Sequence, residues 1–466
     1  MQRTNQYASA VDGLAASCRG AILRPEDAGY DEARAVWNGM FHRRPLIIVR
    51  PRGAADVVAG VRFAREHGLE LTIRGGGHNV AGNAVCDDGL MLDLSEMRSV
   101  RVDAKNRVAR VEPGCVLGDM DRETQAHGLV TPGGFISSTG VAGLTLGGGF
   151  GYTSRKLGLT VDNLISTDLV TAEGDYVHAS SDENPDLFWA LKGGGGNFGV
   201  VTSFEFRLHE LGPDVLAGPV VHWFEDAPEV LRRVADAMKN APDEVSTLLI
   251  LRHAPPAPFL PEHVHGKMIL MLAVIYVGDP AEGEAALAPL REIGQPIVDQ
   301  VMRQPYAAFQ SMFDATVAPG ARNYWKAHFL TDFTPEAIDT LCEQAERMGS
   351  PESAVVMLTL GGAVAREPED SAAYTHRQAG WELNAQARWH EPAEDDTHIA
   401  WSRGVFDAMA PYCTGGVYVN FISREEGAGL IREAYGAAVH QRLLAIKRKW
   451  DPDNAFHHNQ NIDPAG

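Results

Sequence analysis

Glycine is concentrated in one part of this chain, and its placement constrains the fold more than any other sequence feature. Of 48 glycines, 23 lie between residues 71 and 200. Three runs stand out, at 74–79, 147–151 and 193–199. Because glycine has no Cβ, consecutive N–H groups in such runs can form a concave nest for an anion such as a phosphate. The sequence therefore predicts ordered loops in which backbone, rather than side chains, approaches a ligand.

Composition excludes several classes of protein. Hydrophobic residues make up 45% of the 466 positions and charged residues 22%, which are values of a globular protein with a large core. The net charge of −20 works against binding to nucleic acid or to anionic membranes. No apolar stretch of about 18 residues is present, and the N-terminus lacks a signal-peptide pattern, so we expect a cytoplasmic location. The five scattered cysteines indicate neither a disulfide framework nor a zinc site.

The pattern along the chain predicts two structural regions. Helices are expected over 30–40 and 54–67, with a strand on each side of the second helix, which together make a βαβ unit. Alternating strand patterns fill 90–112, and the glycine-rich stretch 131–151 is expected to be an ordered loop. A hairpin is expected over 164–180, a short helix that continues into the third glycine run over 183–196, and a strand over 200–211. After residue 211 glycine becomes rarer, and apolar strands alternate with helices. We place one domain at 1–210, a second α+β domain at 211–412, and a C-terminal segment at 413–466 that contains an amphipathic helix.

The glycine runs do not follow the common nucleotide-binding motifs. A dinucleotide-binding GxGxxG loop requires a helix directly after it, and neither the first nor the third run is followed by one, so a doubly wound NAD-binding domain is the weaker alternative. A P-loop motif is absent. His78 follows the first run directly; it is either a structural histidine or a nucleophile or ligand beside the proposed anion site. No further ligand lies at metal-binding spacing, so no metal site is predicted.

Four stretches together resemble a known family. They are IRGGGHN at 73–79, the segment 131–163, NPDLFWALKGGGGNFGVVTSFEF at 184–206, and YVNF at 418–421 with KRKWDPDNAFHHNQNI at 447–462. This combination resembles the FAD-linked oxidases of the berberine bridge enzyme-like group, in the vanillyl alcohol oxidase (PCMH-type) superfamily. The resemblance runs from about residue 30 to the C-terminus and is loose over 211–412.

The resemblance implies a two-part fold and a covalently bound flavin. It implies a PCMH-type FAD-binding domain, about 40–210, completed by the C-terminal segment, with an inserted α+β substrate domain made of an antiparallel sheet backed by helices. It implies that His78 is bonded to the flavin. Ile136 stands where many members have a second, cysteinyl link, so a single link is expected. The residues implied to contact FAD are Arg74, Gly75, Gly76, Gly77, His78, Asn79, Gly82, Thr139, Gly140, Gly143, Leu144, Gly148, Gly151, Asn197, Gly199, Val200, Tyr418, Asn420, Asn459 and Asn461.

The catalytic base expected in this family does not transfer to this sequence. Many members use the last tyrosine of a YxNY motif, but here that position is Phe421, which has no proton to exchange. Val356 and Ile250 likewise stand about where an oxygenating member has an acid and a tyrosine. The remaining candidates are Tyr152, Tyr324, Lys326 and Tyr418.

Each of these candidates also has a structural alternative. Tyr152 and Tyr418 could line the flavin, Tyr324 could belong to the core, and Lys326 could be a solvated charge or a phosphate partner. An amine substrate that reacts as the free amine would need no base. The resemblance also places Thr139 where members control oxygen access to the flavin. It implies, too, that Thr139 and Leu144 match the neighbourhood that supports an oxygenated flavin in an oxygenating member.

We therefore expect an FAD-dependent oxidase that transfers hydride from a hydrophobic alcohol, amine or polyketide-like molecule to flavin and reduces dioxygen to hydrogen peroxide. The strands expected to face the flavin, at 268–276 and 354–360, are apolar, which favours such a substrate over a free sugar. Family habit suggests a step in secondary metabolism, such as antibiotic biosynthesis. The alternatives are a flavin-dependent oxygenase and a non-catalytic flavin- or ligand-binding protein. We expect a monomer or homodimer, with no nucleic-acid or membrane partner.

Overall fold

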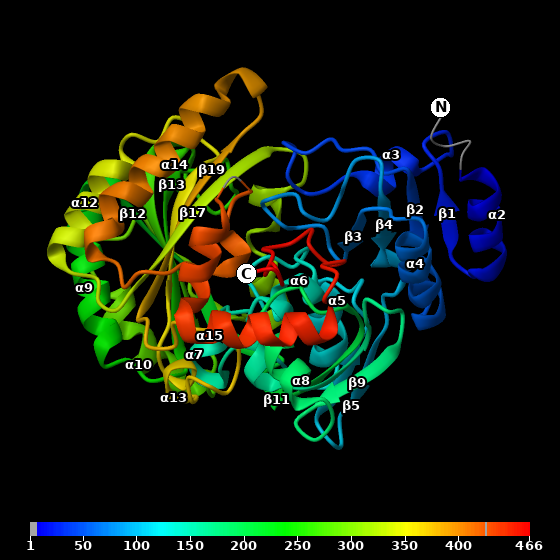
Figure 1. Ribbon diagram of the computed structural model, residues 1–466. Helices are drawn as coiled ribbons and strands as arrows, with labels where there is room; N and C mark the ends of the chain where they lie inside the picture. Colours follow the sequence, from blue (N-terminus) through cyan, green and yellow to red (C-terminus); the bar gives the residue numbers. More distant parts are fainter. Residues whose placement is uncertain (1–6, 425) are drawn as a thin grey trace.

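The computed structural model describes residues 7–424 and 426–466. Its chain forms three main sheets, two of them in one half of the molecule and a large one in the other (Figure 1). The prediction of an α+β fold, with an antiparallel sheet backed by helices, is confirmed. None of the helices in the described ranges combines the length and the apolar composition needed to span a bilayer.

The first sheet contains the predicted βαβ unit. Its strand order is β1-β2-β4-β3, and both β2 and β3 pair with β4 in parallel. Helix α4 connects β2 to β3, and its Val57 and Val61 are buried in the core beneath this sheet. β3 ends at Arg74, the first residue of the first glycine run. The elements are β1 (Ala21–Leu23), β2 (Ile47–Arg50), α4 (Ala54–Glu66), β3 (Leu71–Arg74) and β4 (Leu90–Asp93).

The second sheet is antiparallel and is covered by helices from two distant parts of the chain. Its strands are β5 (Val100–Asp103), β6 (Val108–Val111), β8 (Leu164–Val170), β9 (Tyr176–Ser180) and β10 (Val200–Arg207), in the order β5-β6-β10-β8-β9. The covering helices are α5 (Leu117–Gln125), α6 (Val141–Leu146), α8 (Pro185–Leu191) and the C-terminal α15 (Ala428–Trp450). α15 packs on α8, so the end of the chain returns to the domain in which the chain began (Figure 1).

The third sheet has eight antiparallel strands, with one face covered by helices and the other turned toward the glycine-rich loops. Its strands follow the order β15-β12-β14-β13-β18-β19-β17, and β16 pairs with β12. They are β12 (Asp214–Trp223), β13 (Val245–His253), β14 (Met268–Tyr276), β15 (Val298–Asp299), β16 (Met302–Pro305), β17 (Arg322–Leu330), β18 (Ala354–Thr359) and β19 (Trp381–Trp389). The covering helices are α9 (Ala227–Lys239), α10 (Pro280–Arg291), α12 (Pro335–Ala345) and α14 (Asp395–Met409) (Figure 1).

Strand alternation assigns the side chains of this sheet to its two faces. Leu249 and Leu251 of β13 join the core under the helices, whereas Leu248 and Ile250 join the core that faces the glycine-rich loops. Both faces are buried in the middle of the sheet, which explains why β14 is apolar along its whole length.

Shorter elements complete the chain. They are α2 (Ala8–Ser17), α3 (Tyr30–Arg34), β7 (Leu129–Val130), α7 (Ser154–Leu157), β11 (His209–Glu210), α11 (Tyr306–Gln310) and α13 (Ala363–Arg366), with short 3-10 turns between several of them.

Three predicted elements differ in the structure. The helix predicted over 30–40 ends at Arg34, because Trp37 and Asn38 are held by distant segments: the Trp37 indole donates to Val317 O (2.7 Å) and the Asn38 amide donates to Asn323 O (2.8 Å). The predicted loop 131–151 contains the short helix α6. Helix α15 is kinked at Gly436, whose φ of 68° is outside the helical range.

Candidate active site

A cavity of about 270 Å³ lies between the glycine-rich loops and the face of the eight-stranded sheet that is opposite its covering helices. Its walls come from the first glycine run, the segment 134–144, strands β13, β17, β18 and β19, and the loop 418–421. Of the residues predicted to contact FAD, those on the cavity wall are Gly75, Gly76, Gly77, His78, Asn79, Thr139, Gly140, Gly143, Leu144, Tyr418 and Asn420. The structure therefore brings together predicted residues from three distant stretches of sequence.

The first glycine run offers the cavity a row of unpaired backbone donors. Among the described residues, none accepts a hydrogen bond from the N–H groups of 75–79. The run also touches the second glycine-rich segment, since a Cβ on Gly76 would lie only 2.5 Å from the Gly140 Cα. Backbone N–H groups away from bulk water need acceptors, and successive free N–H groups suit a phosphate or another anion. This donor set fits the pyrophosphate of FAD.

His78 presents a neutral imidazole to the cavity. Its ring stacks on Trp37 with centroids 4.5 Å apart, and its Nε2 lies 3.3 Å from the Ser138 hydroxyl. Burial, assisted by the positive charge of Arg388, lowers the pKa of His78 from 6.5 to about 4. Because a neutral imidazole carries a free lone pair, His78 at neutral pH is a competent nucleophile.

Tyr418 and Asn420 tie the C-terminal loop to the second glycine run. The Tyr418 hydroxyl accepts hydrogen bonds from the Gly149 N–H (3.1 Å) and from the Asn420 amide (2.9 Å). That amide also donates to Gly143 O at 3.2 Å. Burial raises the pKa of Tyr418 well above 10, so its hydroxyl keeps its proton at neutral pH.

An apolar and aromatic surface forms most of the remaining wall. Ile250 and Val356 lie side by side in the register of β13 and β18, and both face the cavity. Phe421 packs edge-on against Trp325 (5.3 Å between centroids) and against Tyr418 (4.9 Å). Strand 354–359 faces the cavity, as predicted from its apolar pattern. Strand 268–276 does not reach the cavity wall, and β13 takes the place predicted for it.

The four candidate bases lie in different places. Tyr324 and Lys326 occupy the helix-covered face of β17, because Asn323 and Trp325 take the positions that face the cavity. The Tyr324 hydroxyl accepts from Arg403 Nε (3.0 Å), and Lys326 pairs with Glu426. We therefore withdraw Tyr324 and Lys326 as candidate bases.

Tyr152 is also outside the cavity wall. It is 1% exposed and packs between Phe135 and Phe309, at 4.9 and 4.7 Å between ring centroids. Burial raises its pKa well above 10, which suits a core residue and not a base. Of the four candidates, Tyr418 alone reaches the cavity.

Several predicted cofactor residues have structural partners outside the cavity. Arg74 donates to Ala33 O (2.6 Å), and its guanidinium lies 3.8 Å from Asp93. Gly148 has a φ of 119°, and a Cβ there would meet the Tyr374 ring. The wall also excludes Gly82, Gly151, Asn197, Gly199, Val200, Asn459 and Asn461, so flavin contact for these residues stays a prediction.

The third glycine run is held by the C-terminal segment. Asn459 donates to Gly196 O (3.0 Å), and the Asn197 carboxamide oxygen accepts from the Ile462 N–H (3.0 Å). The buried Lys447 donates to Asn197 O at 2.9 Å and pairs with Asp451 at 2.7 Å. The third run is thus similar to the first in its glycine content, but these contacts attach it to the C-terminal segment.

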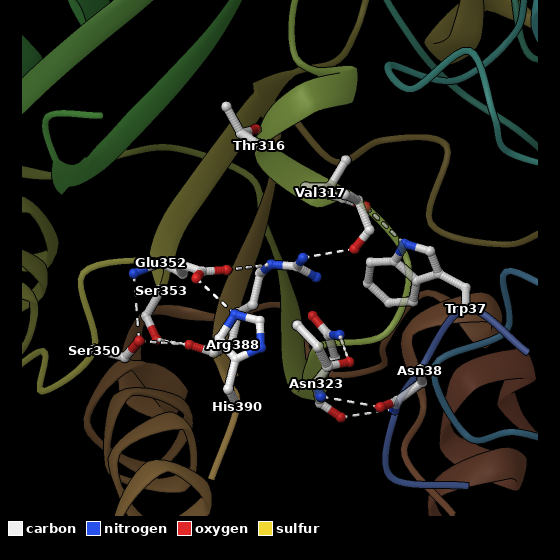
Figure 2. A network of polar contacts seen from close by, with 12 residues as sticks. Trp37, Asn38, Thr316, Val317, Asn323, Ser350, Glu352, Ser353, Arg388 and His390 are labelled. Atoms are coloured by element: carbon white, nitrogen blue, oxygen red, sulfur yellow. Dashed lines mark hydrogen bonds and ion pairs between the residues drawn. The ribbon is translucent and has the colours of Figure 1, made fainter. Parts of the chain in front are cut away.

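Sequence reasoning missed the polar end of the cavity. Arg252, Glu352 and Arg388 line it, together with Asn323 and Gln386. Figure 2 shows Glu352 between the side chains of Arg388 and His390. The signal was present in β19, where Glu382, Asn384, Gln386 and Arg388 alternate with apolar residues. Polar side chains at every second position of a buried strand indicate a face that meets a ligand or a polar network.

Comparisons with known proteins agree with this geometry. Residues 45–180 match the family described as FAD binding domain, and residues 417–463 match the family described as Berberine and berberine like. The chain is 31% identical to an FAD-linked oxidoreductase of Dictyostelium discoideum, over 99% of this chain and 97% of that protein. It is 32% identical to (R)-6-hydroxynicotine oxidase of Paenarthrobacter nicotinovorans, over 97% and 98%.

Solved structures give the same result. The crystal structure of 6-hydroxy-D-nicotine oxidase from Arthrobacter nicotinovorans matches with a TM-score of 0.86 at 30% identity, covering 96% of this chain and 98% of that one. Glucooligosaccharide oxidase from Acremonium strictum, which carries a 6-S-cysteinyl, 8α-N1-histidyl FAD, matches with a TM-score of 0.85 at 23% identity, covering 99% of each. At that identity, the second match shows the fold.

Proposed function

Because this chain belongs to the berberine bridge enzyme-like FAD-linked oxidoreductases, we propose that it oxidises a small, largely apolar alcohol or amine, with dioxygen as the electron acceptor. The observation that carries the proposal is the composition of the cavity wall. One side offers unpaired N–H groups and a neutral histidine, and the other offers an apolar sheet face. The first side suits FAD and the second suits an apolar substrate.

We propose that FAD is attached by a single covalent bond, to His78. The neutral imidazole beside the free N–H groups of 75–79 supports this attachment. Ile136 lines the cavity and carries no thiol, and none of the five cysteines reaches the cavity wall. The chemistry supplied by bound FAD is acceptance of a hydride from a substrate carbon, followed by transfer of two electrons to dioxygen.

The residues of the sheet face position the substrate and exclude water. Ile250, Val356 and Phe421 give the cavity an apolar surface on which an aromatic or aliphatic body is bound by burial of its own apolar area. Burial of this kind removes water from the reacting carbon and holds the substrate in place.

On the described part of the cavity wall, no tyrosinate is available to accept a proton from the substrate. Tyr418 holds its proton at Oη, because burial raises its pKa while its oxygen accepts two hydrogen bonds. Phe421 has no exchangeable proton. This arrangement favours a substrate that loses its hydride without help from a protein base, such as an amine in its free-base form.

A substrate screen tests the proposal. Purified protein is mixed anaerobically with aromatic and aliphatic amines and alcohols while the flavin absorbance is followed. We expect at least one compound to bleach the flavin and air to restore its colour with release of hydrogen peroxide. If no compound of these classes bleaches the flavin, the protein is a non-catalytic binder and the proposal is wrong.

A flavin-dependent oxygenase is a second candidate, favoured by Thr139 and Leu144, which both line the cavity. Labelled dioxygen separates the two functions. Label found only in hydrogen peroxide supports the oxidase, whereas label in the organic product supports the oxygenase.

A further inference from the structure

Two arginines lie on the cavity side of the eight-stranded sheet, at the same end of the cavity. Arg252 of β13 is in register with Ala354 of β18, which is in register with Gln386 of β19. Arg388 is two residues beyond Gln386 and so lies on the same face. The two arginines are only 8% and 5% exposed.

The protein supplies one carboxylate for these two guanidinium groups. Glu352 accepts from Arg388 Nε (2.9 Å) with one oxygen and contacts His390 Nε2 (2.8 Å) with the other (Figure 2). Although burial opposes it, the hydrogen bond from His390 and the charge of Arg388 lower the pKa of Glu352, so this group is ionised. The cluster of Arg252, Arg388 and Glu352 therefore carries one net positive charge.

Both guanidinium groups keep unused donors. Arg388 Nη2 donates to Ala318 O (2.6 Å), but its buried Nη1 has no hydrogen-bond partner among the residues that the structure describes. With those residues Arg252 makes a single hydrogen bond, from Nε to His253 O (3.2 Å). Across the described ranges, no carboxylate lies within 4.0 Å of Arg252.

An unpaired, nearly buried guanidinium is costly, and arginine does not escape this cost by losing its proton. Burial lowers the pKa of Arg252, yet an arginine stays charged at neutral pH. A planar carboxylate matches the guanidinium fork with two parallel hydrogen bonds. One net positive charge also matches a ligand with one negative charge.

We infer that the substrate carries a carboxylate, which binds Arg252 with help from Arg388, while its apolar body lies along Ile250 and Val356. The substrate class is thus an amphipathic monocarboxylic acid with an oxidisable amine or alcohol. This inference rests on the proposed function, because it takes the cavity as the substrate site. Arg252 is a specificity-determining residue in this assignment.

Equilibrium binding to the FAD-loaded protein tests the inference without turnover. The probes are 3-phenylpropanoate and its neutral isostere 3-phenylpropanamide, titrated while the flavin absorbance spectrum is recorded. We expect the acid to bind at least about tenfold more tightly than the amide, as befits a hydrogen bond to a charged group. In Arg252→Met this preference should fall to about one.

Two further variants keep the experiment decisive. Arg303→Met, on the exposed part of β16, makes the same substitution away from the cavity and should keep the wild-type preference. Arg252→Lys retains the charge without the fork and should give an intermediate preference. It also tests the site if the methionine variant does not fold.

Three results would overturn the inference. They are the absence of a preference for the acid in the wild-type protein, including a failure of the acid to bind; an unchanged preference in Arg252→Met; and loss of FAD from that variant, which would assign the arginine to the cofactor. Failure of the proposed function gives a different result, since acid binding without flavin bleaching by any compound would leave the carboxylate site in place.

Discussion

At the residue scale, His78 combines a glycine-rich backbone, a stacked Trp37 ring and a depressed pKa in one position. Each of these properties acts on a different aspect of the imidazole. The stacking fixes the plane of the ring, and burial removes the competing proton. The nucleophilic character of the His78 imidazole therefore depends on its surroundings. A histidine of ordinary pKa would be partly protonated at neutral pH.

We predict that His78→Ala abolishes covalent flavin attachment. Protein precipitated with acid should lose all yellow colour, and its mass should equal that of the polypeptide alone. Ser138→Ala, which removes only the hydroxyl 3.3 Å from Nε2, should keep the flavin attached. Flavin that remains covalently bound in His78→Ala would disprove the assignment.

The pH dependence of attachment follows from the direction of the His78 shift. Because its pKa is lowered to about 4, the imidazole is neutral above that pH, and the rate of FAD incorporation into apoprotein should be flat from about pH 5.5 to 8. A free imidazole would lose about nine-tenths of its neutral form at the lower limit.

We predict that Tyr418→Phe destabilises the protein by about 1–3 kcal/mol, because the Gly149 N–H and the Asn420 amide lose their shared acceptor. Tyr435→Phe is the matched control: Tyr435 is equally buried, but its hydroxyl has no hydrogen-bond partner within 7–424 and 426–466, so its loss should cost little. Denaturant midpoints measure both. Loss of more than about a hundredfold in the rate of flavin reduction in Tyr418→Phe would instead make Tyr418 a base.

At the scale of elements, the close contact between the first two glycine-rich segments determines the shape of the proposed anion site. We predict that Gly76→Ala loses most of its FAD, because the new Cβ would lie 2.5 Å from the backbone of Gly140 and would force the loops apart. Gly196→Ala, in the third run, has open space for its Cβ and should bind FAD normally. The flavin-to-protein absorbance ratio measures both variants, and equal loss in the two would place the third run at the cofactor.

Local patterns predicted the elements whose stability is local. The unit β2-α4-β3 was predicted because apolar residues recur at helical spacing between two β-branched runs. The helix expected over 30–40 was shortened, because the contacts that Trp37 and Asn38 make with residues 317 and 323 are invisible to a local pattern. Secondary-structure propensity is a weak preference that such tertiary contacts override.

The part of the candidate site that consists of glycine-rich loops was predictable from the sequence. The part made by strands was less predictable, because it depends on which of two alternating sets of side chains faces the cavity. The first run and His78 lie on the cavity wall. In β17, however, large or charged residues lie on both faces of the strand. The sequence alone therefore does not show that Trp325 faces the cavity while Tyr324 and Lys326 face the helices. The position of Arg252 near Arg388 depends on the register of β13, β18 and β19, which no short segment of sequence specifies.

At the scale of the whole molecule, the C-terminal helix contacts the third glycine run through Lys447, which donates to Asn197 O and forms a buried ion pair with Asp451. We predict that Lys447→Met costs about 3–5 kcal/mol, because it leaves Asp451 buried without its partner and removes the hydrogen bonds to Asn197 O and Phe456 O. Lys449→Met, on the same helix, breaks a pair with Asp186 whose lysine is 58% exposed and should cost no more than about 1 kcal/mol. Thermal unfolding measures both, and equal shifts would contradict the prediction.

The cavity draws its walls from residues as early as Trp37 and as late as Phe421. During synthesis the glycine-rich loops leave the ribosome long before the sheet that faces them, and the closing loop 418–421 leaves after that sheet. A growing chain therefore contains His78 before the cavity around it is enclosed. The FAD attachment proposed above is thus expected only after the loop 418–421 has been made and has folded against the glycine-rich segments.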